Sequence, residues 1–145
     1  AGDRHRHVFG HAEQFVVLDA SEDDLGLARK IGRVVGQLGL SCHLREDRGR
    51  PAEVRKALTA QLRDCQALMV IHGEVNPEWV EQQWVLYSKI ERPAPARALA
   101  LYLGPPEDKP PVKIPIQVQV LDCRHGLDEA LLRRFLTPLL AGGAA

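Results

Sequence analysis

The sequence predicts an α/β three-layer sandwich built on a mainly parallel five-stranded sheet. Short runs of consecutive apolar residues, typical of strands buried on both faces, alternate with segments whose apolar residues recur at helical spacing. The 145 residues are 45% hydrophobic and 26% charged, which is the composition of one globular domain. Regular alternation of strand and helix patterns implies a parallel sheet covered by helices on both faces.

The first predicted strand runs from Phe15 to Leu18 and leads into a helix. Ser21 and Asp24 form a capping-box pattern where this helix starts, and Gly39 is a typical residue for its end. Residues 40–44 then form a second, short strand. The apolar residues of the helix recur at Leu25, Ala28, Ile31, Val35 and Leu38.

The middle of the chain repeats this pattern. A second helix follows Pro51, and residues 67–71 form a third buried strand. Asn76 before Pro77 is a strong helix opening for residues 78–91, and the fourth strand covers residues 98–103. The second helix is expected to bury Val54, Leu58, Leu62 and Cys65.

The last third of the chain predicts a long connection, an edge strand and a final helix. Residues 104–115 contain five prolines and indicate an irregular surface connection. In residues 116–121, apolar side chains ending with Val120 alternate with Gln117 and Gln119, as on a half-exposed sheet edge. The final helix is expected at residues 127–140, and the strand order at 2-1-3-4-5, which is flavodoxin-like. Its expected buried side chains are Leu127, Leu131, Phe135 and Leu139.

Charge and cysteine content narrow the classes of partner. Nineteen basic residues balance nineteen acidic ones, so we expect no nucleic-acid or anionic-membrane partner. No apolar run reaches the roughly 20 residues that span a bilayer. Cys42, Cys65 and Cys123 form no CxxC pair and have no histidine at metal-ligand spacing. We therefore expect free thiols in a reducing, cytoplasmic compartment and no bound metal.

The sequence predicts one domain at residues 14–140 with a tail at each end. Residues 1–13 and 141–145 lack an apolar period, so we expect flexible tails on a piece of a longer, multidomain chain. A histidine-rich cluster lies in the first tail, and a solvated tail is favoured over a metal or phosphate site. The cluster contains His5, Arg6, His7 and His11.

Several chemistries of doubly wound folds lack their motifs. Sites in these folds gather at the carboxyl ends of the strands. No glycine occurs in residues 19–23, where a dinucleotide-binding loop would follow the first strand, and the chain has no Walker loop. The third strand ends in His72 rather than an acidic phosphoacceptor, and we expect this histidine to be structural. No GxSxG nucleophile elbow is present.

Four segments together resemble a Toll/interleukin-1 receptor (TIR) domain over residues 14–140. Residues 16–23, read VVLDASED, are similar to the family's first strand and acidic helix start. Residues 45–51, read REDRGRP, resemble its BB loop. Residues 64–71, read DCQALMVI, and residues 76–80, read NPEWV, resemble its third strand and the helix start that contains tryptophan.

The resemblance also implies an altered catalytic position. NAD-cleaving relatives carry a glutamate four residues after that tryptophan, and counting from Trp79 gives Gln83. A neutral amide supplies no negative charge to an oxocarbenium-like transition state. Glu81, about 200° round the helix from Gln83, and Glu78 are fallback carboxylates. If NAD binds, Asp19 and Ser21 are expected to contact it together with Trp79 and Gln83.

The resulting hypothesis is a non-enzymatic TIR-like signalling or defence module without a cofactor. Its expected partners are other protein domains or copies of itself. The expected contact residues are Arg45, Asp47, Arg48, Gly49, Arg50 and Pro51. Val80, Trp84 and Tyr87 are interpreted as core in preference to an aromatic interaction surface. The alternatives are an NAD glycohydrolase or NAD-derived signal synthase, and a nucleotide-binding sensor that keeps the cleft.

Overall fold

The computed structural model describes residues 14–45, 49–90 and 98–140. Both predicted tails lie outside this part of the chain, and so does the N-terminal histidine cluster. Asp47 and Arg48 of the predicted contact loop also lie outside it.

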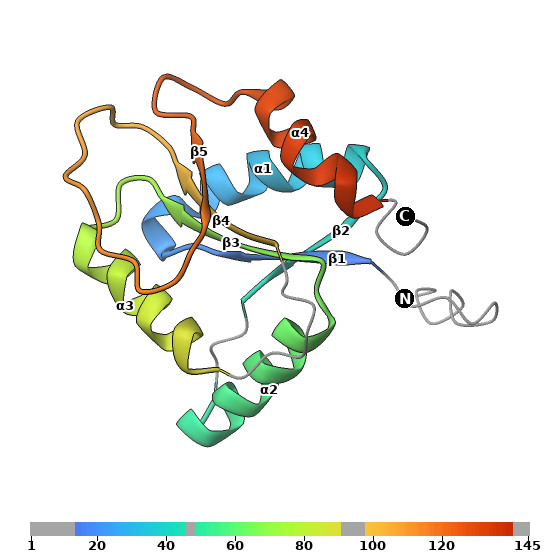
Figure 1. Cartoon of the computed structure of the whole chain (residues 1–145), viewed down its shortest axis with the longest axis vertical. Coiled ribbons are helices and arrows are strands. Elements are labelled where there is room, and N and C mark those ends of the chain that lie inside the picture. Colours follow the sequence, from blue (N-terminus) through green and yellow to red (C-terminus); the bar gives the residue numbers. More distant parts are fainter. Residues whose placement is uncertain (1–13, 46–48, 91–97, 141–145) are drawn as a thin grey trace.

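The five strands form one parallel sheet in the order β2-β1-β3-β4-β5, which confirms the predicted flavodoxin-like fold (Figure 1). β3 is central, and all six of its residues are buried, as its unbroken apolar run predicts. The bounds of the strands are β1 Phe15–Asp19, β2 Ser41–Leu44, β3 Ala67–His72, β4 Ala98–Leu103 and β5 Gln119–Asp122.

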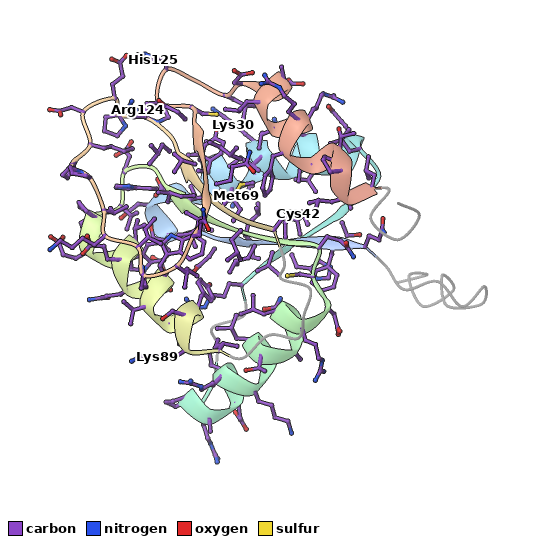
Figure 2. All side chains as sticks on the ribbon, viewed as in Figure 1. Lys30, Cys42, Met69, Lys89, Arg124 and His125 are labelled. Atoms are coloured by element: carbon purple, nitrogen blue, oxygen red, sulfur yellow. The ribbon has the colours of Figure 1, made fainter. Side chains whose placement is uncertain are left out.

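Helices cover both faces of the sheet, with α1 and α4 on one face and α2 and α3 on the other (Figure 1). Alternate residues of β3 serve the two cores: Met69 packs on the α1 side, and Leu68 on the α2 and α3 side. Figure 2 shows Met69 between the sheet and α1. The helices are the short η2 Glu22–Asp24, then α1 Leu25–Gln37, α2 Pro51–Asp64, α3 Pro77–Lys89 and α4 Glu129–Leu140.

No helix joins β4 to β5. Residues 104–118, called the strap below, instead pass beside α3 before entering the sheet (Figure 1). Half-buried side chains of the strap pack on the α3-side core, and the backbone N–H of Lys113 donates to Glu81 Oε2 at 2.7 Å. The strap residues that pack on this core are Val112, Ile114, Ile116 and Val118.

The expected bounds of the fifth strand are wrong. The alternating pattern belongs to the strap, which packs only one of its sides, and β5 begins at Gln119. Val120 was expected to face inward but is 50% exposed, whereas the next residue, Leu121, is fully buried. The two-residue period therefore reports one-sided packing here rather than pairing within the sheet.

Two helix starts also differ in detail. Ser21 makes no capping hydrogen bond, and the helix proper begins only at Leu25, after η2. The final helix begins at Glu129, where Asp128 Oδ1 accepts from the N–H of Leu131 at 3.1 Å. Leu127 lies before this helix and is exposed, so the fully buried stripe falls on Leu132 and Leu136, with Phe135 also buried.

Other predicted features are confirmed. Asn76 Oδ1 caps α3 by accepting from the N–H of Trp79 at 2.8 Å. Cys42, Cys65 and Cys123 form no disulfide with one another. None of the helices in the described ranges is long and apolar enough to cross a membrane.

Candidate functional site

A buried polar network joins the carboxyl ends of β1 and β2 to α3. Asp19 is the last residue of β1, and Arg45 directly follows β2. Arg45 Nη1 lies 3.3 Å from Asp19 Oδ2 and also donates to Gln83 Oε1. The hydroxyl of Tyr87 donates to Asp19 Oδ2 at 2.5 Å. One carboxylate and one guanidinium thus organise side chains from three elements.

Burial and charge set the ionisation of this network. Burial by itself lowers the pKa of Arg45, but the neighbouring Tyr87 and Asp19 more than offset it and raise the pKa above its usual value. Burial, reinforced by the negative charge of Asp19, raises the pKa of Tyr87. The Tyr87 hydroxyl therefore stays protonated and acts as a donor, while Arg45 keeps its positive charge beside Asp19.

Gln83, the residue at the expected glutamate position, is engaged at both ends of its amide. Its oxygen accepts from Arg45, and its nitrogen donates to the carbonyl of Trp79 at 3.2 Å. Only 9% of the residue is exposed. The amide thus helps to hold Arg45 in place by accepting a hydrogen bond from its guanidinium.

The four residues expected around NAD separate into two groups. Asp19 and Gln83 are brought together through Arg45. Ser21 Oγ is buried and has no hydrogen-bond partner among the described residues, and Trp79 is half-buried against the α3-side core. Ser21 takes no part in the network hydrogen bonds that the structure describes, and Trp79 contributes only its backbone carbonyl, which accepts from Gln83.

The fallback carboxylates are not part of the network. Glu81 accepts the N–H of Lys113, so it fastens the strap to α3. Glu78 is exposed in the first turn of α3. The expectation that one of them replaces the missing glutamate gains no support from these positions.

Sequence reasoning assigned Tyr87 to the core and missed its role as a hydrogen-bond donor. Tyr87 follows Gln83 by four residues, so both lie on one face of α3. That spacing, together with an acidic residue ending β1, was the available signal. Trp84 and Val80 are fully buried, which confirms their interpretation as core.

A second polar cluster lies between the β1–α1 and β3–α3 connections. The carboxylate of Asp24, 3% exposed, accepts from three consecutive backbone N–H groups. These donors are Gly73 at 3.2 Å, Glu74 at 2.7 Å and Val75 at 3.3 Å. The predicted capping-box role of Asp24 is replaced by a connection between two loops at the carboxyl edge of the sheet.

Comparison with known proteins adds little to this description. No family model matches the chain, and no curated protein matches it. Among solved structures, it is similar to a diflavin flavoprotein A3 from Nostoc sp., with a TM-score of 0.47 and 13% identity. That match covers 92% of this chain and 99% of the other. A likeness at this level carries no argument about ligands. The class that the sheet itself defines is a flavodoxin-like α/β domain.

Proposed function

We propose that this chain is a non-catalytic TIR-like signalling or defence module that acts through protein-protein assembly. The observation that carries the proposal is the contact of Gln83 with Arg45. Where NAD-cleaving relatives need a free carboxylate, this chain has a neutral amide that holds a cation. The one carboxylate in the network, Asp19, is already paired with Arg45 and Tyr87.

The network also supports a role for the loop at residues 45–51. Besides its side-chain contacts, Arg45 donates its backbone N–H to the carbonyl of Leu18 at 2.9 Å, so the first end of the loop is fixed to the sheet. The other end is fixed at the start of α2, where the N–H of Arg50 donates to Glu53 Oε1 at 3.4 Å. Gly49, with φ of +110°, is exposed between these ends. Fixed ends lower the entropic cost of presenting a loop to a partner.

The partner surface that we favour is the β5 edge of a second copy. β5 is the last strand of the sheet, and its Gln119, Val120 and Asp122 are exposed. Contact between a loop and a sheet edge is heterologous, so repeated copies form open filaments, or rings where the rotation closes, instead of two-fold dimers. Because the loop is rich in charge, this contact should weaken as salt shortens the Debye length to about 8 Å at physiological ionic strength.

Light scattering at low and high salt tests the assembly. We expect concentration-dependent growth at low salt, and its loss in Arg50→Glu. The matched control is Arg63→Glu, which makes the same charge change at the far end of α2, where Arg63 is exposed and pairs only weakly with Asp64 at 3.7 Å. If native protein stays monomeric at its highest soluble concentration, homotypic assembly is wrong. If both variants lose assembly equally, the loop is not the contact surface.

A further inference from the structure

A pocket of about 330 Å³ lies between the strap and the α3-side face of the sheet. Its apolar wall comes from Leu101 and Leu103 of β4 and from Val112 and Ile114 of the strap. Val120 of β5 completes this wall and is 50% exposed. The volume is at the lower end of the range for small-molecule pockets.

Basic and donor groups line the end of the pocket near the carboxyl edge of the sheet. His72, Lys109 and Arg124 all contribute to it. Figure 2 shows Arg124 in the segment that follows β5, and its guanidinium reaches back to the carbonyl of Glu107 in the strap at 3.3 Å. Arg124 is also paired with Asp122 at 2.9 Å, so its charge is largely neutralised.

The positive charge of Lys109 is not neutralised in this way. Its Nζ donates to the carbonyl of Gly73 at 2.5 Å, which is a neutral acceptor. Within the described ranges no salt bridge holds it; the acidic groups that act on it from a longer range are Asp24 and Glu74. An ammonium on a half-buried strap residue therefore retains donor capacity toward the pocket.

His72 supplies the independent observation that points to a ligand. It is the last residue of β3, is only 2% exposed, and lines the pocket. Its Nδ1 is fully buried and has no hydrogen-bond partner in the part of the chain that is described. Buried polar atoms are nearly always satisfied, and a hydrogen bond between the ring and the Val75 backbone leaves one ring nitrogen of His72 for a further partner.

We propose that this pocket binds a small organic anion, a carboxylate or a phosphate monoester with a short aliphatic body. The anionic group lies between Lys109 and His72, at the edge where doubly wound folds place their ligands. The aliphatic body packs on Leu101, Ile114 and Val120. This site is separate from the network of Arg45, but it shares Val120 with the β5 edge proposed for assembly, so binding is measured on the monomeric protein at low concentration.

Hexanoate, hexyl phosphate and hexan-1-ol, which share one aliphatic chain, test the proposal by NMR on the ¹⁵N-labelled protein. We expect both anions to shift the His72 side-chain resonances and the amide resonances of β4 and the strap. Hexan-1-ol should bind with about fivefold lower affinity than the anions, since a charge-assisted contact at a partly exposed site contributes about 1 kcal/mol. The ratio between the two anions identifies the preferred head group.

Lys109→Met is expected to lower the affinity for both anions about fivefold and to leave the affinity for hexan-1-ol unchanged. Lys113→Met is the matched control on the same strap, because its side chain is exposed and does not line the pocket. If Lys109→Met proves misfolded by its amide spectrum, Lys109→Arg, which keeps the charge, must retain binding. Equal affinity for hexanoate and hexan-1-ol, equal loss in the two methionine variants, or no resonance shifts at saturating probe would each overturn the proposal.

Discussion

The hydroxyl of Tyr87 donates to Asp19 Oδ2 at 2.5 Å, and this contact ties the middle of α3 to the end of β1. Asp19 is 3% exposed and Tyr87 is fully buried, so neither group can exchange its partner for water. A buried carboxylate is tolerated only when it is paired and hydrogen-bonded. The contact is therefore a structural requirement of the network that also holds Arg45.

Tyr87→Phe should destabilise the domain by about 1–3 kcal/mol, because it removes a donor from a buried carboxylate and puts nothing in its place. Guanidinium unfolding followed by circular dichroism measures the change. Ser88→Ala is the control: it also removes one hydroxyl from α3, but from an exposed position where Oγ donates to the carbonyl of Val85. A loss of stability no larger than that of the control would contradict the role assigned to Tyr87.

The elements that depend on local chemistry were predictable from the sequence. The unbroken apolar run of β3 and the Asn76 cap of α3 need only neighbouring residues to be recognised. The strap was misread in part because one-sided packing on a helix produces the same two-residue period as an edge strand. The partners of Asp24 could not be foreseen, since they lie about 50 residues away along the chain.

The candidate site was predictable to a similar extent. Spacing from Trp79 identified Gln83, which does lie at the carboxyl edge of the sheet. The contact of Gln83 with Arg45 depends on how β2 pairs with β1 and where α3 packs, and both are tertiary relationships. The interpretation of Arg45 as part of a contact loop missed that its side chain turns inward, where it is 15% exposed.

Gly73→Ala should be strongly destabilising, because an added Cβ would lie 2.3 Å from Asp24 Oδ1 and 2.7 Å from its Cγ. We expect a loss of about 1–3 kcal/mol, since the carboxylate must move away from its three backbone donors. Gly36→Ala is the matched control in α1, where a Cβ meets nothing within 4 Å. That change should be neutral or stabilise by up to about 1 kcal/mol. Thermal unfolding of the two variants compares them, and similar melting temperatures would refute the close contact.

His72 should make stability depend on pH. Burial lowers the pKa of His72 and the positive charge of Lys109 lowers it further, while Asp24 and a hydrogen bond with the Val75 backbone oppose the shift. Below about 6.5, the usual value for the unfolded chain, the unfolded state binds a proton that the folded state resists. Stability should therefore fall as the pH drops from 6.5 toward the lowered folded pKa.

His72→Gln removes this proton and keeps a polar side chain. The measurement is the difference in unfolding free energy between pH 7.5 and pH 5.5 within each protein, so a general loss of stability in the variant cancels. We expect a smaller difference in the variant than in the native chain. The same pH dependence in both proteins would show that other groups cause it.

Cys42 should react slowly in the folded protein. Desolvation by burial raises the pKa of its thiol to about 11, so little thiolate is present at pH 8. Iodoacetamide labelling followed by mass spectrometry should modify this cysteine much faster in denaturant than in native buffer. Rapid native labelling of Cys42, or a defined intramolecular disulfide, would disagree with the structure, in which the three cysteines form no disulfide.

Gln83→Glu should not create an NAD-cleaving enzyme. The new carboxylate would lie against the Arg45 guanidinium that now contacts the glutamine oxygen, so an ion pair would neutralise the charge that a developing oxocarbenium ion requires. Asp19 already contacts the same guanidinium. Only 9% of Gln83 is exposed, which further restricts the access of NAD to a carboxylate at this position. Nicotinamide release from NAD, followed by chromatography at high protein concentration, is expected to match the buffer blank for the native chain and for the variant.

Glu81→Gln serves as a third sample because Glu81 is the fallback carboxylate and now binds the strap. Steady turnover by the native chain that disappears in Glu81→Gln would replace the assembly proposal with an NAD glycohydrolase. Turnover gained only in Gln83→Glu would show instead that the amide alone keeps this site inactive.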